Sequence, residues 1–128
     1  MADTTTTLQN LKDLVEQFTK ERDWQKFHTP KNVSMALSGE VAELMEFFYW
    51  CESKESFDIT NQNLETIKHE VADIACYLLI FCNRTGIDLA QAITEKMALN
   101  AQKYPVELCK GKSDKYTTYQ DLRKVNPE

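Results

Sequence analysis

The two stretches that decide the fold of this chain are Glu40-Val-Ala-Glu43 and Glu70-Val-Ala-Asp73. Each stretch places two acids three residues apart, so that in a helix both side chains point from one face. Apolar residues recur at helical spacing around both stretches, and the acids border this apolar side instead of lying opposite it. If the two helices pair, four carboxylates converge at a partly buried position.

Four carboxylates in one place need a counter-charge. Two carboxylates about 5 Å apart repel each other by roughly 3 kcal/mol at an effective dielectric near 20. Such pairs also occur on ordinary solvated helix faces, but two of them beside apolar stripes, with aromatic residues one or two turns further on, favour a metal site. A hard divalent cation with oxygen ligands removes the conflict. The predicted ion is Mg²⁺, with Mn²⁺ as the alternative, and its predicted ligands are Glu40, Glu43, Glu70 and Asp73.

The composition is that of an ordinary globular domain, with 42% hydrophobic and 27% charged residues in a chain of 128. We expect one domain over residues 1–128, with its core at about 8–105 and a flexible tail at 106–128. The 20 acids and 15 bases give a net charge of -5, which argues against stable nucleic-acid binding. No apolar run is long enough for a membrane span and the first residues do not look like a signal peptide, so a cytosolic protein that can diffuse into the nucleus is expected.

The four cysteines do not form a metal-binding pattern. No two of them have CxxC spacing, and with only two histidines in the chain a zinc site or a histidine-based triad is disfavoured. Cys76 and Cys82 fall in an apolar helical segment, and we expect both to be small core residues in a reducing compartment.

Hydrophobic spacing predicts four helices, at about 8–22, 32–51, 63–84 and 89–103. The polar residues 52–63 have no periodicity and are predicted to form a loop. Four helices with short links form an antiparallel four-helix bundle, so the predicted fold class is all-α, without a strand. The predicted helix caps are one threonine of the run Thr4–Thr7, Asn32, Asn61 or Asn63, and Asp88.

The connector before the second helix carries three ring side chains, Trp24, Phe27 and His28. These rings either close the end of the bundle or form a slot for a flat base. Gly39 lies inside the second helix, where an interior glycine indicates close approach by a neighbouring helix or a ligand.

On the fourth helix, Lys96, Asn100 and Lys103 share one face. They form either a solvated basic stripe or a set of donors for phosphate oxygens. Acid-bearing bundles also include the di-iron carboxylate proteins, which need Glu-x-x-His pairs. Here the fourth positions are Glu43 and Asp73, which excludes a di-iron oxidase.

The spacing of ExxE and ExxD in an all-helical chain resembles that of the MazG-like nucleoside triphosphate pyrophosphatases. The resemblance runs from about Leu8 to Tyr119 and is closest to the dCTP pyrophosphatase branch. The segments that carry it are Glu21-Arg-Asp-Trp-Gln-Lys-Phe-His-Thr-Pro-Lys-Asn32, Gly39-Glu-Val-Ala-Glu-Leu44, the end of the second helix at Phe47–Trp50, and Lys96-Met-x-x-Asn-x-x-Lys-Tyr-Pro105.

This resemblance implies a Mg²⁺-dependent homotetramer that hydrolyses dCTP, and base-modified dCTP, to dCMP and pyrophosphate and so controls the dNTP pool. It implies that Glu40, Glu43, Glu70 and Asp73 are the metal ligands and catalytic acids, one of them, such as Glu43, orienting the attacking water. The implied base contacts are Trp24, Phe27, His28 and Trp50, with Tyr77 near the sugar, and the implied phosphate contacts are Lys96, Asn100, Lys103 and Tyr104.

One residue departs from the family pattern, since Val15 stands where the related dCTP pyrophosphatases carry a histidine. The ranking of cytosine nucleotides is therefore open. Two alternatives to dCTP hydrolysis remain: the same reaction on another base, such as dUTP or a damaged purine triphosphate, and a non-catalytic helical interaction module that binds Mg²⁺ or Ca²⁺ structurally. An oligomer is also predicted because Phe47, Phe48, Tyr49 and Trp50 cover every side of a helix with apolar surface.

Overall fold

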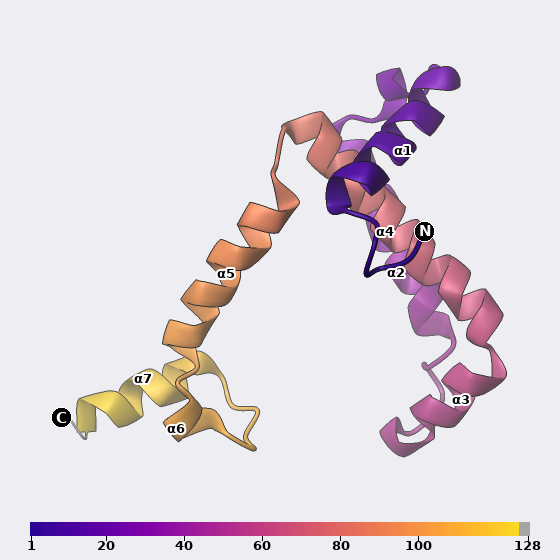
Figure 1. The fold of residues 1–128 in the computed structure, drawn as a ribbon. Coiled ribbons are helices and arrows are strands. Elements are labelled where there is room, and N and C mark those ends of the chain that lie inside the picture. The colour runs from indigo at the N-terminus through magenta and orange to yellow at the C-terminus, as the bar shows by residue number, and fades with distance from the viewer. Residues whose placement is uncertain (126–128) are drawn as a thin grey trace. The chain divides into compact units, whose positions relative to one another are not determined.

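The computed structural model describes residues 1–125, which form helices and no strand. The predicted all-α fold is confirmed. None of these helices is long and apolar enough to cross a membrane. In chain order the helices are α1 (Leu8–Glu21), α2 (Pro30–Glu46), α3 (Ser56–Gln62), α4 (Leu64–Thr85), α5 (Leu89–Lys103), α6 (Val106–Cys109) and α7 (Tyr116–Val125), with 3₁₀ turns at Gln25–Phe27 and Ser53–Glu55 (Figure 1).

The helices form two units that separate between Ile87 and Asp88. The first contains α1 to α4, and the second contains α5 to α7. In the first unit α4 returns antiparallel beside α2, and α1 packs against α4 (Figure 1). Three of the four predicted helices thus pack together, and the fourth, α5, belongs to the second unit. The single domain expected over residues 1–128 stays a prediction.

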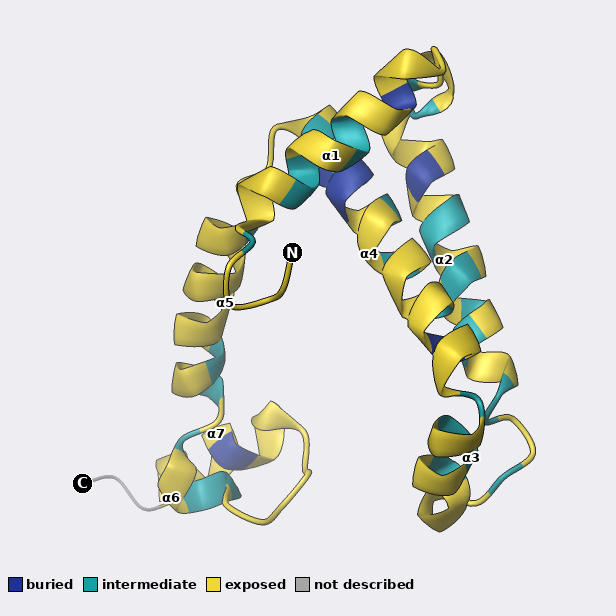
Figure 2. Ribbon diagram, turned by 45° about the vertical axis from the view of Figure 1, so that its right-hand side comes forward, coloured by how far each residue is buried: buried dark blue, intermediate teal, exposed yellow. Residues whose placement is uncertain are grey.

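The core of the first unit is small and lies along α4 (Figure 2). Val33 of α2 is only 1% exposed, and Thr19 of α1 is buried with its hydroxyl donating to the carbonyl of Glu16 at 3.0 Å. Gly39 has no close neighbour in this chain, since a Cβ atom added there would meet nothing within 4 Å. No neighbouring helix of the first unit therefore approaches this glycine closely, and approach by a ligand stays a prediction. The buried residues of α4 are Ile67, Leu79, Ile80 and Cys82.

Two of the predicted caps are confirmed. Thr7 caps α1 in a reciprocal box, in which its hydroxyl accepts from the backbone N–H of Asn10 and the Asn10 side chain accepts from the N–H of Thr7. Asp88 caps α5 by accepting from the N–H of Gln91 at 2.9 Å.

The second helix begins two residues earlier than predicted. Thr29 has extended backbone and its hydroxyl accepts from the N–H of Asn32, so Thr29 is the cap and Pro30 is the first helical residue. Proline suits that position, because its ring fixes φ near the helical value and its missing N–H is not needed there. The prediction that Asn32 caps this helix is wrong.

In place of the loop predicted at 52–63, the structure has a 3₁₀ turn and the short helix α3. Polar side chains hold this segment, which explains why hydrophobic periodicity did not reveal it. The Glu55 carboxylate accepts from the N–H of Glu52 at 2.7 Å. Asn63 precedes α4, but its amide donates to the Ile59 carbonyl at the end of α3 instead of capping α4.

The segment predicted as a flexible tail contains α6 and α7 within its residues 106–125, and residues 126–128 lie outside the described part; its flexibility stays a prediction. The ring of Tyr119 is 1% exposed and meets the ring of Tyr104 edge-on at 5.9 Å. Tyr116 lies three residues before Tyr119, on the same side of α7, and also contacts Tyr104, at 6.5 Å. Three tyrosines therefore hold the second unit together.

Candidate active site

The pairing of α2 and α4 brings three of the four predicted acids together. Carboxylate oxygens of Glu40, Glu43 and Glu70 lie within 4.8 Å of one another. Glu40 and Glu43 are separated by three residues and therefore project from one side of α2 toward Glu70 on α4. Glu40 and Glu70 are half-buried, whereas Glu43 is exposed.

The surroundings of Glu40 and Glu70 favour the protonated forms of these two acids. Burial raises the pKa of Glu40, and the charges of Glu43 and Asp73 raise it further. The pKa of Glu70 is also raised, first by burial and then by the neighbouring Glu43 carboxylate and the charges of Glu40 and Asp73. In addition, the buried Oε2 atom of Glu70 has no hydrogen-bond partner among residues 1–125.

A divalent cation fits this environment. A buried carboxylate oxygen without a donor is uncommon in folded proteins. Oxygen-only ligands and excess negative charge are the properties of Mg²⁺ and Mn²⁺ sites. Asp73 is not in the group of three within 4.8 Å, although it is near enough for its charge to raise the pKa of both Glu40 and Glu70.

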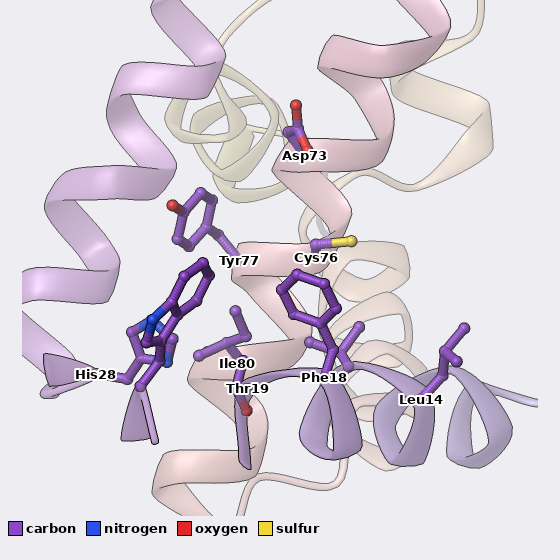
Figure 3. A pocket seen from close by; sticks show the side chains of 10 residues that line it. Leu14, Phe18, Thr19, His28, Asp73, Cys76, Tyr77 and Ile80 are labelled. Atoms are coloured by element: carbon purple, nitrogen blue, oxygen red, sulfur yellow. The ribbon is translucent and has the colours of Figure 1, made fainter. Parts of the chain in front are cut away.

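Asp73 also lies on the wall of a neighbouring cavity of about 450 Å³ in the first unit. In Figure 3, Asp73 and then Tyr77 and Ile80 follow one another along α4 toward α1. The other walls come from α1 and from the connector between α1 and α2. The cavity residues on α1 are Leu14, Val15, Phe18 and Thr19.

The connector contributes Trp24 and His28 to the cavity. The Trp24 ring meets Phe18 edge-on, with centroids 5.7 Å apart, and it remains 44% exposed. The Nδ1 atom of His28 is buried and has no hydrogen-bond partner among the described residues. The cavity is therefore mostly apolar, with a few polar atoms available to a ligand.

Two of the predicted base contacts lie elsewhere. Phe27 is 58% exposed, and the Lys26 ammonium lies 5.3 Å from the centre of its ring. Trp50 lies in the turn beyond the end of α2 and is 98% exposed. Neither side chain lines the cavity, so within this unit Trp24, His28 and Tyr77 are the predicted base and sugar residues that do.

The predicted phosphate contacts belong to the second unit. Lys96, Asn100 and Lys103 lie on α5, and Tyr104 follows its last residue. The ammonium of Lys103 lies 5.0 Å from the centre of the Tyr116 ring. The last lysine of the basic stripe thus contacts α7 through one ring of the tyrosine cluster.

Comparison with known proteins agrees with this arrangement of acids and helices. Residues 35–122 match the model of the MazG-like family. The chain belongs to the MazG-like family. The resemblance inferred from the spacing of the acids is therefore confirmed.

Several relatives of this MazG-like chain carry the name dCTP pyrophosphatase 1. The proteins of Rattus norvegicus and Bos taurus are both 40% identical to it over 113 residues, and the Homo sapiens protein is 36% identical. These matches cover 87% of this chain and 66%, 67% and 66% of the three relatives, so the chain spans about two thirds of their length.

A solved structure is also similar. The crystal structure of a pyrophosphatase from Archaeoglobus fulgidus is 36% identical and matches with a TM-score of 0.75. The match covers 82% of this chain and 98% of that one.

Some cavity residues were not singled out as site residues from the sequence. The apolar residues of α1 follow a helical repeat that predicts a core stripe, and periodicity does not distinguish a core from the wall of a cavity. The same ambiguity affected the cysteines of α4. Cys82 is buried, as predicted, but Cys76 is an exposed residue of the cavity wall. Partial burial of its thiol there, and then the charge of Asp73, raise the pKa of the thiol.

Proposed function

We propose that this MazG-like chain hydrolyses dCTP to dCMP and pyrophosphate in a Mg²⁺-dependent reaction. One observation carries the proposal: Asp73 belongs to the surroundings of the acidic group and to the wall of the cavity. A site for phosphate-bound metal and a site for a base thus adjoin each other in one unit. The relatives named dCTP pyrophosphatase 1 support the choice of substrate.

Glu40, Glu43 and Glu70 would hold the cation, with Asp73 as the fourth ligand. When bound, Mg²⁺ neutralises phosphate charge and makes a water molecule more acidic. The exposed Glu43 is the acid best placed to meet an arriving water, so we assign it the role of general base. The half-buried Glu40 and Glu70 would stay fixed as ligands.

The cavity would bind the base and sugar. The rings of Trp24 and Tyr77 offer flat apolar faces for stacking. The unpartnered Nδ1 of His28 needs a polar partner, which the edge of a cytosine can provide. Phe27 and Trp50 remain candidates for base contacts only if they meet the base from outside this cavity.

The triphosphate would be contacted from α5. Lys96 and Lys103 supply positive charge, and Asn100 and Tyr104 supply uncharged donors on the same stretch. Phosphate oxygens accept charge-assisted hydrogen bonds from ammonium groups, so we favour phosphate binding over a merely solvated basic stripe as the role of this face.

We further propose that the chain assembles into a homotetramer. No residue of α5 is buried, and three of its apolar side chains, Ile93, Met97 and Leu99, are 50–60% exposed. Trp50, at 98% exposure, is a second apolar surface that no residue among 1–125 covers. Light scattering at micromolar concentration should give a multiple of 14.9 kDa; a monomer mass would contradict the assembly.

A panel of triphosphates tests the activity. The purified protein is incubated with dCTP, 5-methyl-dCTP, dUTP and the purine dNTPs, with Mg²⁺ or with EDTA, and the release of pyrophosphate is measured. We expect release from the cytosine nucleotides that EDTA abolishes. Faster release from dUTP would identify a different base specificity, and no release from any triphosphate would leave the metal-binding interaction module.

A further inference from the structure

The connector Asp23–His28 forms one wall of the cavity with little packing to hold it. Trp24 and Phe27 are 44% and 58% exposed, and Asp23 has a φ of 53°, a left-handed conformation that carries a steric cost. Within the connector, the N–H of Phe27 donates to Trp24, the N–H of His28 donates to Gln25, and Lys26 pairs with Asp23. Its first residues are also tied to α1, through the N–H groups of Asp23 and Trp24 and the side chain of Gln25. These bonds leave the orientation of its end, at Phe27 and His28, unfixed.

Side chains from outside the connector supply that orientation. The amide of Asn32, in the first turn of α2, donates to the carbonyl of Phe27 at 3.0 Å. The Nε atom of Arg84, in the last turn of α4, donates to the carbonyl of His28 at 3.2 Å. Two successive carbonyls of the connector are therefore held by two different helices. Neither donor lines the cavity.

The residue types at both positions fit this role. Asn32 is the third residue of α2, where an acid would suit the helix better, but a carboxylate, unlike an amide, cannot donate to a carbonyl. Arg84 forms no ion pair within residues 1–125, and its hydrogen bond there goes to the His28 carbonyl. Helix stability alone does not explain why Asn32 is not an acid.

We propose that Asn32 and Arg84 are positioning residues that hold the end of the connector, and with it His28, against the cavity beside Trp24, and so set the affinity of the cavity for the base of the nucleotide. For the identity of its ligand this inference rests on the proposed function. A preorganised ring wall lowers the cost of binding, whereas a loose wall must be ordered by the ligand. We call the two hydrogen bonds of Asn32 and Arg84 to the connector the clamp. Because the base is bound equally in the ground and transition states, losing the clamp raises KM and leaves kcat nearly unchanged.

Asn32→Asp is the sharpest variant. It keeps the shape of the side chain and favours the start of α2, but its carboxylate cannot donate to the Phe27 carbonyl. We expect KM for dCTP to rise about three- to tenfold, with kcat within about twofold of wild type and an unchanged or higher Tm. Amide hydrogen exchange at Phe27 and His28 should become about tenfold faster.

Arg84→Lys tests the second donor. Lysine keeps the positive charge at the end of α4 but lacks the Nε–H in the plane of the guanidinium. The same changes in KM and in exchange at His28 are expected, at smaller size. In the double variant with Asn32→Asp the effects should be less than additive, because one released connector cannot be released twice.

Asn63→Asp is the matched control. Asn63 also donates its side-chain amide to a carbonyl, that of Ile59 at 2.9 Å, and also stands at the start of a helix. Its replacement should leave KM and the exchange of the connector amides unchanged.

Hydrogen exchange needs no substrate, so it separates the two proposals. Inactivity of the wild type on every triphosphate would refute the proposed function, while connector exchange in Asn32→Asp would still decide whether the clamp exists. Unchanged exchange at Phe27 and His28 in both variants would overturn the clamp. An equal rise in KM in Asn63→Asp, or faster exchange throughout α2, would also overturn it, because either result indicates a general loss of stability.

Discussion

In the first unit, α2 and α4 enclose partly buried acids beside a small apolar core, whereas in the second unit α5 runs for 15 residues without burying one of them. The first unit therefore gathers negative charge, which the proposed cation would neutralise, and the second exposes apolar side chains on α5, which the proposed oligomer would cover. The two units thus differ in what each is proposed to bind. This contrast predicts that metal controls the stability of the first unit and that aromatic packing controls that of the second.

The largest expected effect is in the second unit. Tyr119→Ala removes the side chain that packs against Tyr104 and leaves a cavity in its place, so amide exchange in α7 should accelerate at least about a hundredfold. Exchange in α4 should not change. Tyr119→Phe keeps the ring and serves as the control. An equal acceleration in α4 would show that the two units unfold together, and the contrast between them would fail.

The next effect is at the acids of the first unit. Glu43→Gln removes a negative charge that raises the pKa of Glu40 and Glu70, so the Tm in EDTA should rise. It also removes the proposed general base, and turnover of dCTP should fall at least about a hundredfold. Added Mg²⁺ should raise the Tm of the wild type more than that of the variant.

Glu46→Gln is the matched control, since Glu46 is an exposed acid at the end of the same helix. It should change neither turnover nor the effect of Mg²⁺. A Glu43→Gln variant that melts lower in EDTA and still hydrolyses dCTP would show that Glu43 is an ordinary surface acid.

The fold of the first unit could be predicted because its helices are amphipathic and its acids repeat at a regular spacing. The segments that were missed lack that signal. The short helix α3 is held by polar side chains such as Asn63, and α7 is anchored by Tyr119, whose partner Tyr104 lies outside that helix. Single-helix periodicity cannot show a cluster of rings that is assembled from separate segments.

The candidate site, like the fold, could be predicted only in part from the sequence. Residue type and spacing were enough to bring Glu40, Glu43 and Glu70 together. They were not enough to place Phe27 and Trp50, because an aromatic residue in a connector can face either a cavity or solvent. They also could not show the bonds of Asn32 and Arg84, since a donor to a backbone carbonyl leaves no pattern in the sequence.

A smaller effect compares an enclosed ring with an exposed one. Trp24→Ala removes a ring from the cavity wall, and dCTP binding should weaken about 10- to 100-fold. Trp50 is 98% exposed in this chain, so Trp50→Ala should weaken binding only if a second copy brings the ring to the base. Isothermal titration with dCTP and Ca²⁺ measures both. Unaltered affinity in Trp50→Ala would show that Trp50 does not contact the base. Unaltered affinity in Trp24→Ala would show that the cavity does not bind the base.

For His28→Ala a smaller loss of dCTP affinity than for Trp24→Ala is expected, because water can replace an imidazole.

The smallest expected effect is the pH dependence of the metal-free protein. The pKa of Glu40 and of Glu70 is raised above the ordinary value of 4.5, first by burial and then by the neighbouring acids. The folded state therefore binds protons more tightly than the unfolded chain does, and its free energy of unfolding must fall as the pH rises from 4.5 through the raised values.

Denaturant unfolding in EDTA, at pH values from 4.5 to about 7, measures this fall. Mg²⁺ should reverse it, because the cation binds the deprotonated carboxylates of the folded state. Glu43→Gln should reduce it, because the charge of Glu43 contributes to the raised pKa of both Glu40 and Glu70. Stability in EDTA that rises with pH over this interval, in wild type and variant alike, would mean that folding does not disfavour the charged acids. The carboxylates of the first unit would then not repel one another enough to need a cation. The two units would differ only in how their apolar side chains pack.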